Sequence, residues 1–71
     1  MDGNEQVMDW ITSELEVESC ITQDYPRFQA GKRVIDRSGD YLIVYFHPFL
    51  EKVVYTFKGI EDFYFIAKKL C

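Results

Sequence analysis

The stretch that decides the fold is DYLIVYFHPFLEKVVYTF, residues 40–57. β-Branched and aromatic residues dominate its two halves, 40–46 and 51–57, and such residues favour strands. Pro48 fixes the backbone φ angle within the intervening turn, residues 47–50. The stretch therefore predicts two antiparallel strands joined by a short turn.

A third strand is expected upstream, over residues 31–36. Between it and the strand at 40–46, the turn has Asp36 at its first position and Gly39 at its last. This pattern is typical of a type I turn that ends on a left-handed residue. The three strands would then form an antiparallel meander.

Helical periodicity flanks this sheet on both sides. In residues 4–18 the apolar stripe consists of Val7, Met8, Ile11 and Leu15, with Trp10 well off its centre. In residues 59–70 the stripe consists of Ile60, Phe63, Tyr64, Ala67 and Leu70. We therefore predict an α+β fold of order α-β-β-β-α in a single small domain, residues 1–71. Both helices would pack on one face of a three-stranded antiparallel meander.

A chain of 71 residues builds only a marginal core. Its aromatic content of 17% offers large side chains that can compensate. A second subunit is the other source of stability, so a homodimer is a further expectation.

The net charge of −4 is unevenly distributed. Residues 1–25 hold seven acidic residues and neither Lys nor Arg, whereas residues 26–71 hold eight basic and five acidic residues. An acidic N-terminal helix repels nucleic acid and favours a basic partner. A solvated helix face is the simpler interpretation of the same pattern.

Several features predict a cytoplasmic protein without a membrane anchor. No run reaches the roughly 18 apolar residues of a membrane span, and the acidic N-terminus does not resemble a signal peptide. The two cysteines, Cys20 and Cys71, are fewer than a disulfide-stapled secreted domain of this size usually carries.

Catalysis and cofactor binding are poorly supported. The single histidine, His47, lies beside Pro48 in a turn, and no cysteine or serine is spaced to pair with it. Cys20 and Cys71 lack the close ligand spacing of a zinc site, and the four glycines form no phosphate-binding motif. We expect no enzyme activity, no metal and no cofactor.

Some apolar residues have no obvious place in the predicted core. Phe65 falls on the polar side of the predicted last helix, and Phe49 and Leu50 lie at a hairpin tip. The strand at 40–46 is apolar on both faces, so we expect Tyr41, Ile43 and Tyr45, with Tyr55 or Thr56, to form an exposed patch. The alternatives are a Phe65 lying flat on the surface, a turn folded back over the core, and a loop at 19–31 that covers this face.

The sequence thus favours a small acidic, non-enzymatic protein-binding module that acts as an inhibitor or adaptor by occluding a basic partner surface. The candidate contact residues are Trp10, Tyr41, Ile43, Tyr45, Phe49, Leu50 and Phe65, with Asp9, Glu14, Glu16 and Glu18 attracting the partner. The alternative is a nucleic-acid-binding domain, because α-β-β-β-α is also the topology of double-stranded RNA-binding domains. It would use Arg27, Lys32, Arg33 and Arg37 around the first strand.

Overall fold

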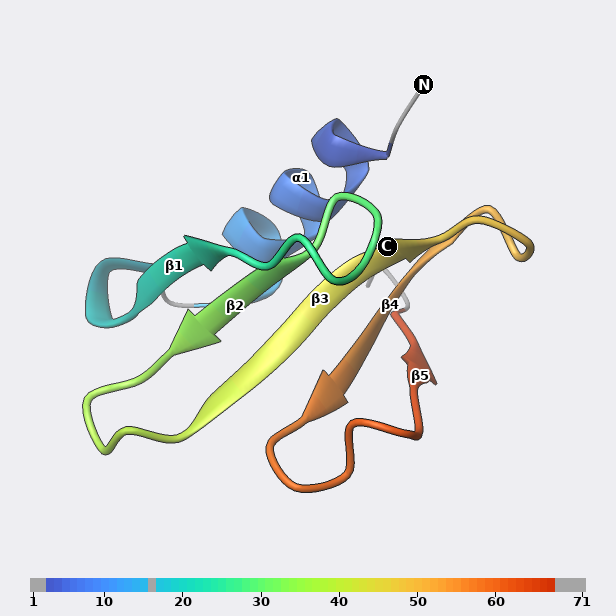
Figure 1. Ribbon diagram of the computed structural model, residues 1–71. Coiled ribbons are helices and arrows are strands. Elements are labelled where there is room, and N and C mark those ends of the chain that lie inside the picture. Colours follow the sequence, from blue (N-terminus) through green and yellow to red (C-terminus); the bar gives the residue numbers. More distant parts are fainter. Residues whose placement is uncertain (1–2, 16, 68–71) are drawn as a thin grey trace.

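The computed structural model describes residues 3–15 and 17–67, and of Val17 it describes the backbone (Figure 1). In this part of the chain one helix accompanies a five-stranded antiparallel meander of order β1-β2-β3-β4-β5. The elements are α1 (Asn4–Glu14), a short 3₁₀ turn η1 (Val17–Ser19), β1 (Ile21–Asp24), β2 (Lys32–Ile35), β3 (Tyr41–His47), β4 (Lys52–Phe57) and β5 (Phe65–Ile66).

The three central strands, β2 to β4, lie where the sequence predicts them, with bounds that differ by at most one residue. The turn between β2 and β3 is also as expected. The Asp36 carboxylate accepts hydrogen bonds from the backbone N–H groups of Ser38 and Asp40 at 2.9 and 3.1 Å. Gly39 has a left-handed φ of +88°, which glycine adopts without steric cost.

The predicted second helix is wrong, and with it the two-helix, three-strand fold. Residues 65 and 66 form β5, which pairs with β4 in the register Tyr55↔Phe65 and Val54↔Ile66. Gly59 turns the chain with a φ of +86°, and the run from Phe63 to Ile66 consists of aromatic and β-branched residues that suit a strand. The rest of the predicted helix, residues 68–70, lies outside the described residues.

Strand β1 lies within residues 19–31, which the sequence predicts to be a loop. It pairs with β2 along its whole length although all four of its residues are exposed. Cross-strand polar contacts hold it: Lys32 Nζ lies 2.6 Å from Asp24 Oδ1, and the Arg33 guanidinium donates to Gln23 Oε1 at 2.7 Å. Such pairs stabilise an edge strand that buries little apolar area.

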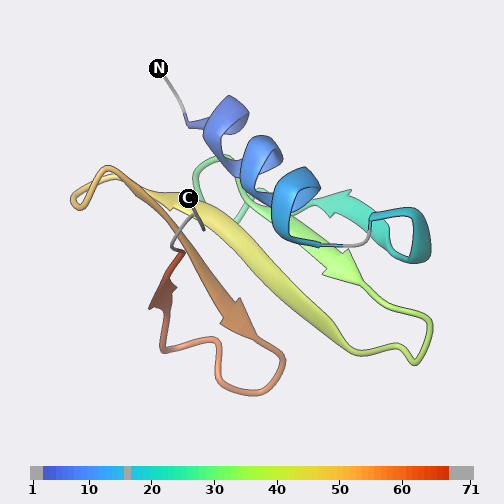
Figure 2. The same ribbon diagram turned by 180° about the vertical axis from the view of Figure 1, so that it is seen from behind.

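Helix α1 crosses one face of the sheet (Figure 2). Val7 and Ile11 are fully buried and pack with Val34 and Val44 of the central strands. The helix begins after Gly3, whose φ is +84° and where a Cβ would collide with the Phe46 ring. It ends at Glu14, four residues before the predicted end, because Leu15 has extended backbone angles.

The opposite face of the sheet holds a second core of Ile43, Tyr45 and Val54. The loop at residues 25–31 crosses in front of this face in Figure 1 and stacks the Phe28 ring on Tyr45, with 4.2 Å between ring centroids. Ile43 is therefore fully buried and Tyr45 is only 8% exposed. The expected exposed patch of Tyr41, Ile43 and Tyr45 is wrong, because this loop covers the face.

Candidate partner-binding groove

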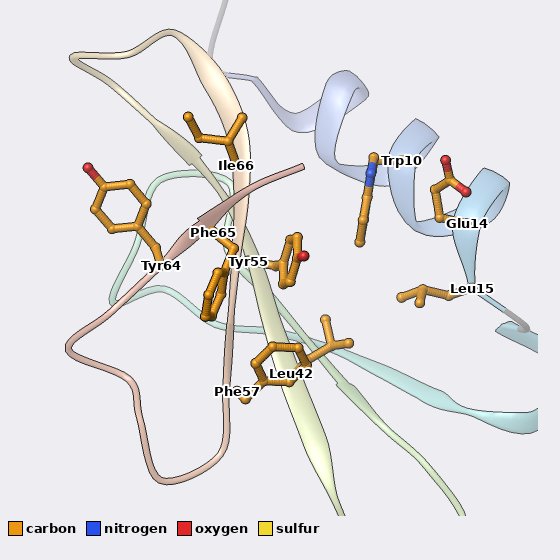
Figure 3. A pocket seen from close by; sticks show the side chains of 9 residues that line it. All are labelled: Trp10, Glu14, Leu15, Leu42, Tyr55, Phe57, Tyr64, Phe65 and Ile66. Atoms are coloured by element: carbon orange, nitrogen blue, oxygen red, sulfur yellow. The ribbon is translucent and has the colours of Figure 1, made fainter. Parts of the chain in front are cut away.

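An open groove runs between the C-terminal half of α1 and the β4–β5 part of the sheet (Figure 3). Its volume is about 980 Å³. Leu42, Tyr55, Phe57 and Phe65 form its floor, and Trp10, Glu14 and Leu15 form the wall on the helix side. Tyr64 and Ile66 line its far end along β5.

The groove exists because α1 covers only part of this sheet face. The helix packs on β3 and β4, and in the described part of the chain Figure 2 shows no helix over β5. Side chains of β4 and β5 that point to this face therefore stay accessible. Phe57 is 42% exposed and Phe65 is 44% exposed.

The floor of the groove is a connected set of aromatic rings. Tyr55 lies at its centre. The ring centroids of Phe57 and Phe65 each lie 5.6 Å from the Tyr55 centroid, and the Trp10 indole stacks on Tyr55 with 5.4 Å between centroids. Phe57 and Phe65 are 5.8 Å apart. Ring pairs at these separations attract one another, which restricts the motion of the floor side chains.

Exposed apolar side chains are concentrated in the chain segment from the end of β4 to β5, and four of them line this groove. Of the nine large apolar residues that are exposed in the described part of the chain, six lie between residues 57 and 66. These six are Phe57, Ile60, Phe63, Tyr64, Phe65 and Ile66. A concentration of this kind marks an interaction surface more often than an ordinary protein surface.

The helix side of the groove is acidic. Glu14 lines the groove, and α1 carries Glu5, Asp9 and Glu14 without a Lys or Arg. Glu18, which was predicted to attract a partner, is exposed in η1, and Glu16 lies outside the described residues. The structure thus places part of the predicted acidic surface beside the aromatic floor.

Trp10 is a groove residue, although the sequence places it off the apolar stripe of α1. It is 8% exposed because its indole lies flat on Tyr55. Its Nε1 atom is buried, with no acceptor in the described part of the chain. The Trp10 indole thus forms part of the groove wall.

Phe49 and Leu50, the predicted hairpin-tip contacts, lie outside the groove. Phe49 is 91% exposed and Leu50 is 39% exposed. The backbone N–H of Leu50 donates to His47 Nδ1 at 3.2 Å, and the His47 ring packs near Tyr64 at 5.0 Å. His47 therefore acts as a turn and packing residue in this structure.

Tyr41, the third residue of the expected patch, is half-buried on the second face. Its hydroxyl donates to Glu61 Oε2 over 3.4 Å, and the Arg33 guanidinium lies 5.3 Å from its ring centroid. Burial, together with the negative charge of Glu61, raises the pKa of Tyr41 above its ordinary value. These contacts tie the residue into the protein.

The structure does not gather the four predicted nucleic-acid contacts into one surface. Lys32 and Arg33 are neighbours in β2 and so point to opposite faces of the sheet. Arg27 lies in the loop before β2, with its guanidinium 5.6 Å from the Phe28 ring. Arg37 lies in the turn after β2, at the other end of the strand.

In residues 3–15 and 17–67 no three His, Cys, Asp or Glu side chains converge as metal ligands would. No helix of these residues has the length and apolar character needed to cross a membrane. Comparisons with protein-family models, with curated proteins and with solved structures find no match to this chain. The function must therefore be argued from the groove.

The sequence points to three of the groove residues, Trp10, Glu14 and Phe65, names Tyr55 only as a possible member of the patch on the opposite face, and misses Leu42 and Phe57. Tyr55 and Phe57 stand two residues apart in a strand, which puts both rings on one face. That spacing is the signal that could have found them. It was ambiguous because the face covered by α1 could not be known.

Proposed function

We propose that this chain is a small acidic, non-enzymatic protein-binding module, which acts as an inhibitor or adaptor by occluding a basic partner surface. One observation carries the proposal: an aromatic floor of Tyr55, Phe57 and Phe65 lies open beside the acidic helix α1. Aromatic side chains dominate binding energy at protein interfaces. Acidic groups at the rim accelerate association with a basic partner.

The ring contacts within the floor support binding in a second way. Tyr55 is held between Trp10 and the two phenylalanines, so little side-chain freedom remains to be lost when a partner covers it. Such preordering lowers the entropic cost of association. A partner that covers Phe57 and Phe65 also removes exposed apolar surface from water.

The cytoplasm is the proposed site of action, supported by the low number of cysteines in a chain of 71 residues. A homodimer that uses the same groove would be a competing occupant. The nucleic-acid alternative has weaker support, because the topology on which it rested is not the one observed.

The proposal is tested by capturing partners from cell lysate with the tagged protein, with and without nuclease. Phe65→Ala removes a ring from the groove floor, and Phe49→Ala is the matched control at an exposed site outside it. We expect nuclease-resistant partners that Phe49→Ala retains and that Phe65→Ala loses by roughly tenfold or more. Capture that survives Phe65→Ala, or that nuclease abolishes, would contradict the proposal.

A further inference from the structure

We propose that the natural occupant of the groove is a basic amphipathic α-helix of the partner, which lies beside α1 over β4 and β5. This inference rests on the proposed function and names the class of partner element that the groove accepts. Three features of the groove support it: its shape, the arrangement of its floor and its charge.

The shape of the groove matches a missing second helix. A sheet that packs helices on one face covers that face with a layer of them, and here α1 packs on β3 and β4 while the described residues place no helix over β5. The open space has the sheet as its floor and α1 as one wall (Figure 3). A helix about 10 Å in diameter occupies the position next to its neighbour in such a layer.

The floor favours a helix over an extended strand. The N–H of Ala67 donates to the Val53 carbonyl at 3.0 Å. In an antiparallel ladder the N–H and C=O of the neighbouring residue, Ile66, then point away from β4, to the outer edge of β5. An extended partner would pair at that edge. A strand added there would extend the sheet sideways and leave Tyr55 and Phe57 uncovered. A helix with apolar residues at i, i+3, i+4 and i+7 covers these rings directly.

The charge of the groove determines which helix fits. Glu14 is the acidic residue of α1 that lines the groove, and α1 carries no Lys or Arg. Lys or Arg on the flank of the partner helix that faces α1 would complement this negative charge. A second copy of this chain would bring its own acidic α1 to the same interface, which is electrostatically unfavourable.

The test uses synthetic peptides and the single tryptophan of the chain, Trp10, as the fluorescent reporter. The probe is a tryptophan-free amphipathic peptide of about 15 residues, long enough to be helical when stabilised by a staple. It carries Leu on one face and Lys on both flanks. The controls are the same stapled peptide with Glu in place of Lys, and an unstapled version with a central proline.

We expect the Lys peptide to change Trp10 emission with saturation and both control peptides to bind at least about tenfold more weakly. Glu14→Lys should weaken the Lys peptide by roughly three- to tenfold, as expected for reversal of a rim charge. Glu5→Lys, at the far end of α1, is the matched control and should change binding less. Phe65→Ala should weaken binding by about tenfold or more.

Failure of this inference is distinguishable from failure of the proposed function. If the proline peptide binds as well as the helical one, the helical partner is refuted and the groove remains a binding site. The same conclusion follows if no peptide binds while capture from lysate still depends on Phe65. If sedimentation shows a dimer that Phe65→Ala dissociates, the occupant is a second copy and the inference is wrong. If capture does not depend on Phe65, both proposals fail together.

Discussion

Tyr45→Ala tests whether the loop at residues 25–31 closes the second core. The Tyr45 side chain is 8% exposed, stacks on Phe28 at 4.2 Å and packs with Ile43 and Val54. Truncation of a buried aromatic residue to alanine costs about 3–5 kcal/mol. A chain of 71 residues is expected to have a total stability of roughly 4–11 kcal/mol. The substitution should therefore remove a large part of the free energy of unfolding.

The assay is urea denaturation followed by far-ultraviolet circular dichroism. With a urea m-value of about 1–1.5 kcal/mol/M, the midpoint should fall by roughly 2–5 M. Phe49→Ala, at a 91% exposed site, is the control and should change stability by less than about 0.5 kcal/mol. A double-mutant cycle between Phe28→Ala and Tyr45→Ala should give a coupling of about 0.5–1.5 kcal/mol. A loss below about 1 kcal/mol for Tyr45→Ala would show that this face is open and that the loop does not cover it.

Three further substitutions test other parts of the account. Phe65→Ala, at a 44% exposed site, should lower stability by less than about 1 kcal/mol in thermal melts while it impairs binding. Unfolding of this variant would instead show that Phe65 belongs to the core. Gly31→Ala places a Cβ against the Tyr25 carbonyl oxygen and should cost about 1–3 kcal/mol in urea denaturation, whereas an unchanged midpoint would mean that the loop is not tightly closed. Hydrogen bonding by Ser38, above all from its hydroxyl, holds the pKa of Asp36 below 3.8, so its stabilisation is present at neutral pH and is lost as pH falls through the lowered pKa. In Asp36→Asn the urea midpoint should therefore depend less on pH below about pH 4 than it does in the wild type. A midpoint that falls as steeply with decreasing pH in the variant would refute this role.

The sequence predicts the central strands and their first turn because the signals there are local. β-Branched and aromatic residues fill β3 and β4, and the Asp36–Gly39 turn is specified by its own side-chain hydrogen bonds. The same holds for α1, in which two of the three buried residues, Val7 and Ile11, lie on the predicted stripe and the third, Trp10, lies off it. No distant contact is needed to decide these elements.

The last element could not be predicted because its competing signals are close to balanced. Ile60, Phe63, Tyr64 and Ala67 fit a helical period, yet residues 65 and 66 pair with β4. Phe65 pairs with Tyr55, ten residues away, and its ring stacks on the Tyr55 ring. Such non-local pairing overrides a local pattern.

The candidate site was found only in part for the same reason. The sequence marks Phe65 as an apolar residue without a place in the core, and the structure keeps it exposed, but on a strand instead of a helix. Tyr45 fails as a contact residue because Phe28, which no periodic pattern connects to it, covers its ring. Which of two apolar sheet faces is covered depends on the path of the loops, and no periodic sequence pattern predicts that path.

The groove between α1 and β5 is the central claim, and site-specific photo-crosslinking tests it most directly. The crosslinking amino acid p-benzoylphenylalanine replaces Phe65 on the groove floor in one sample and the exposed Phe49 in another. After irradiation in cell lysate, the account predicts a discrete crosslinked protein from position 65 that an excess of unlabelled wild-type protein competes away, and none from position 49. A discrete adduct from position 49 alone would contradict the account and place the binding surface at the hairpin tip.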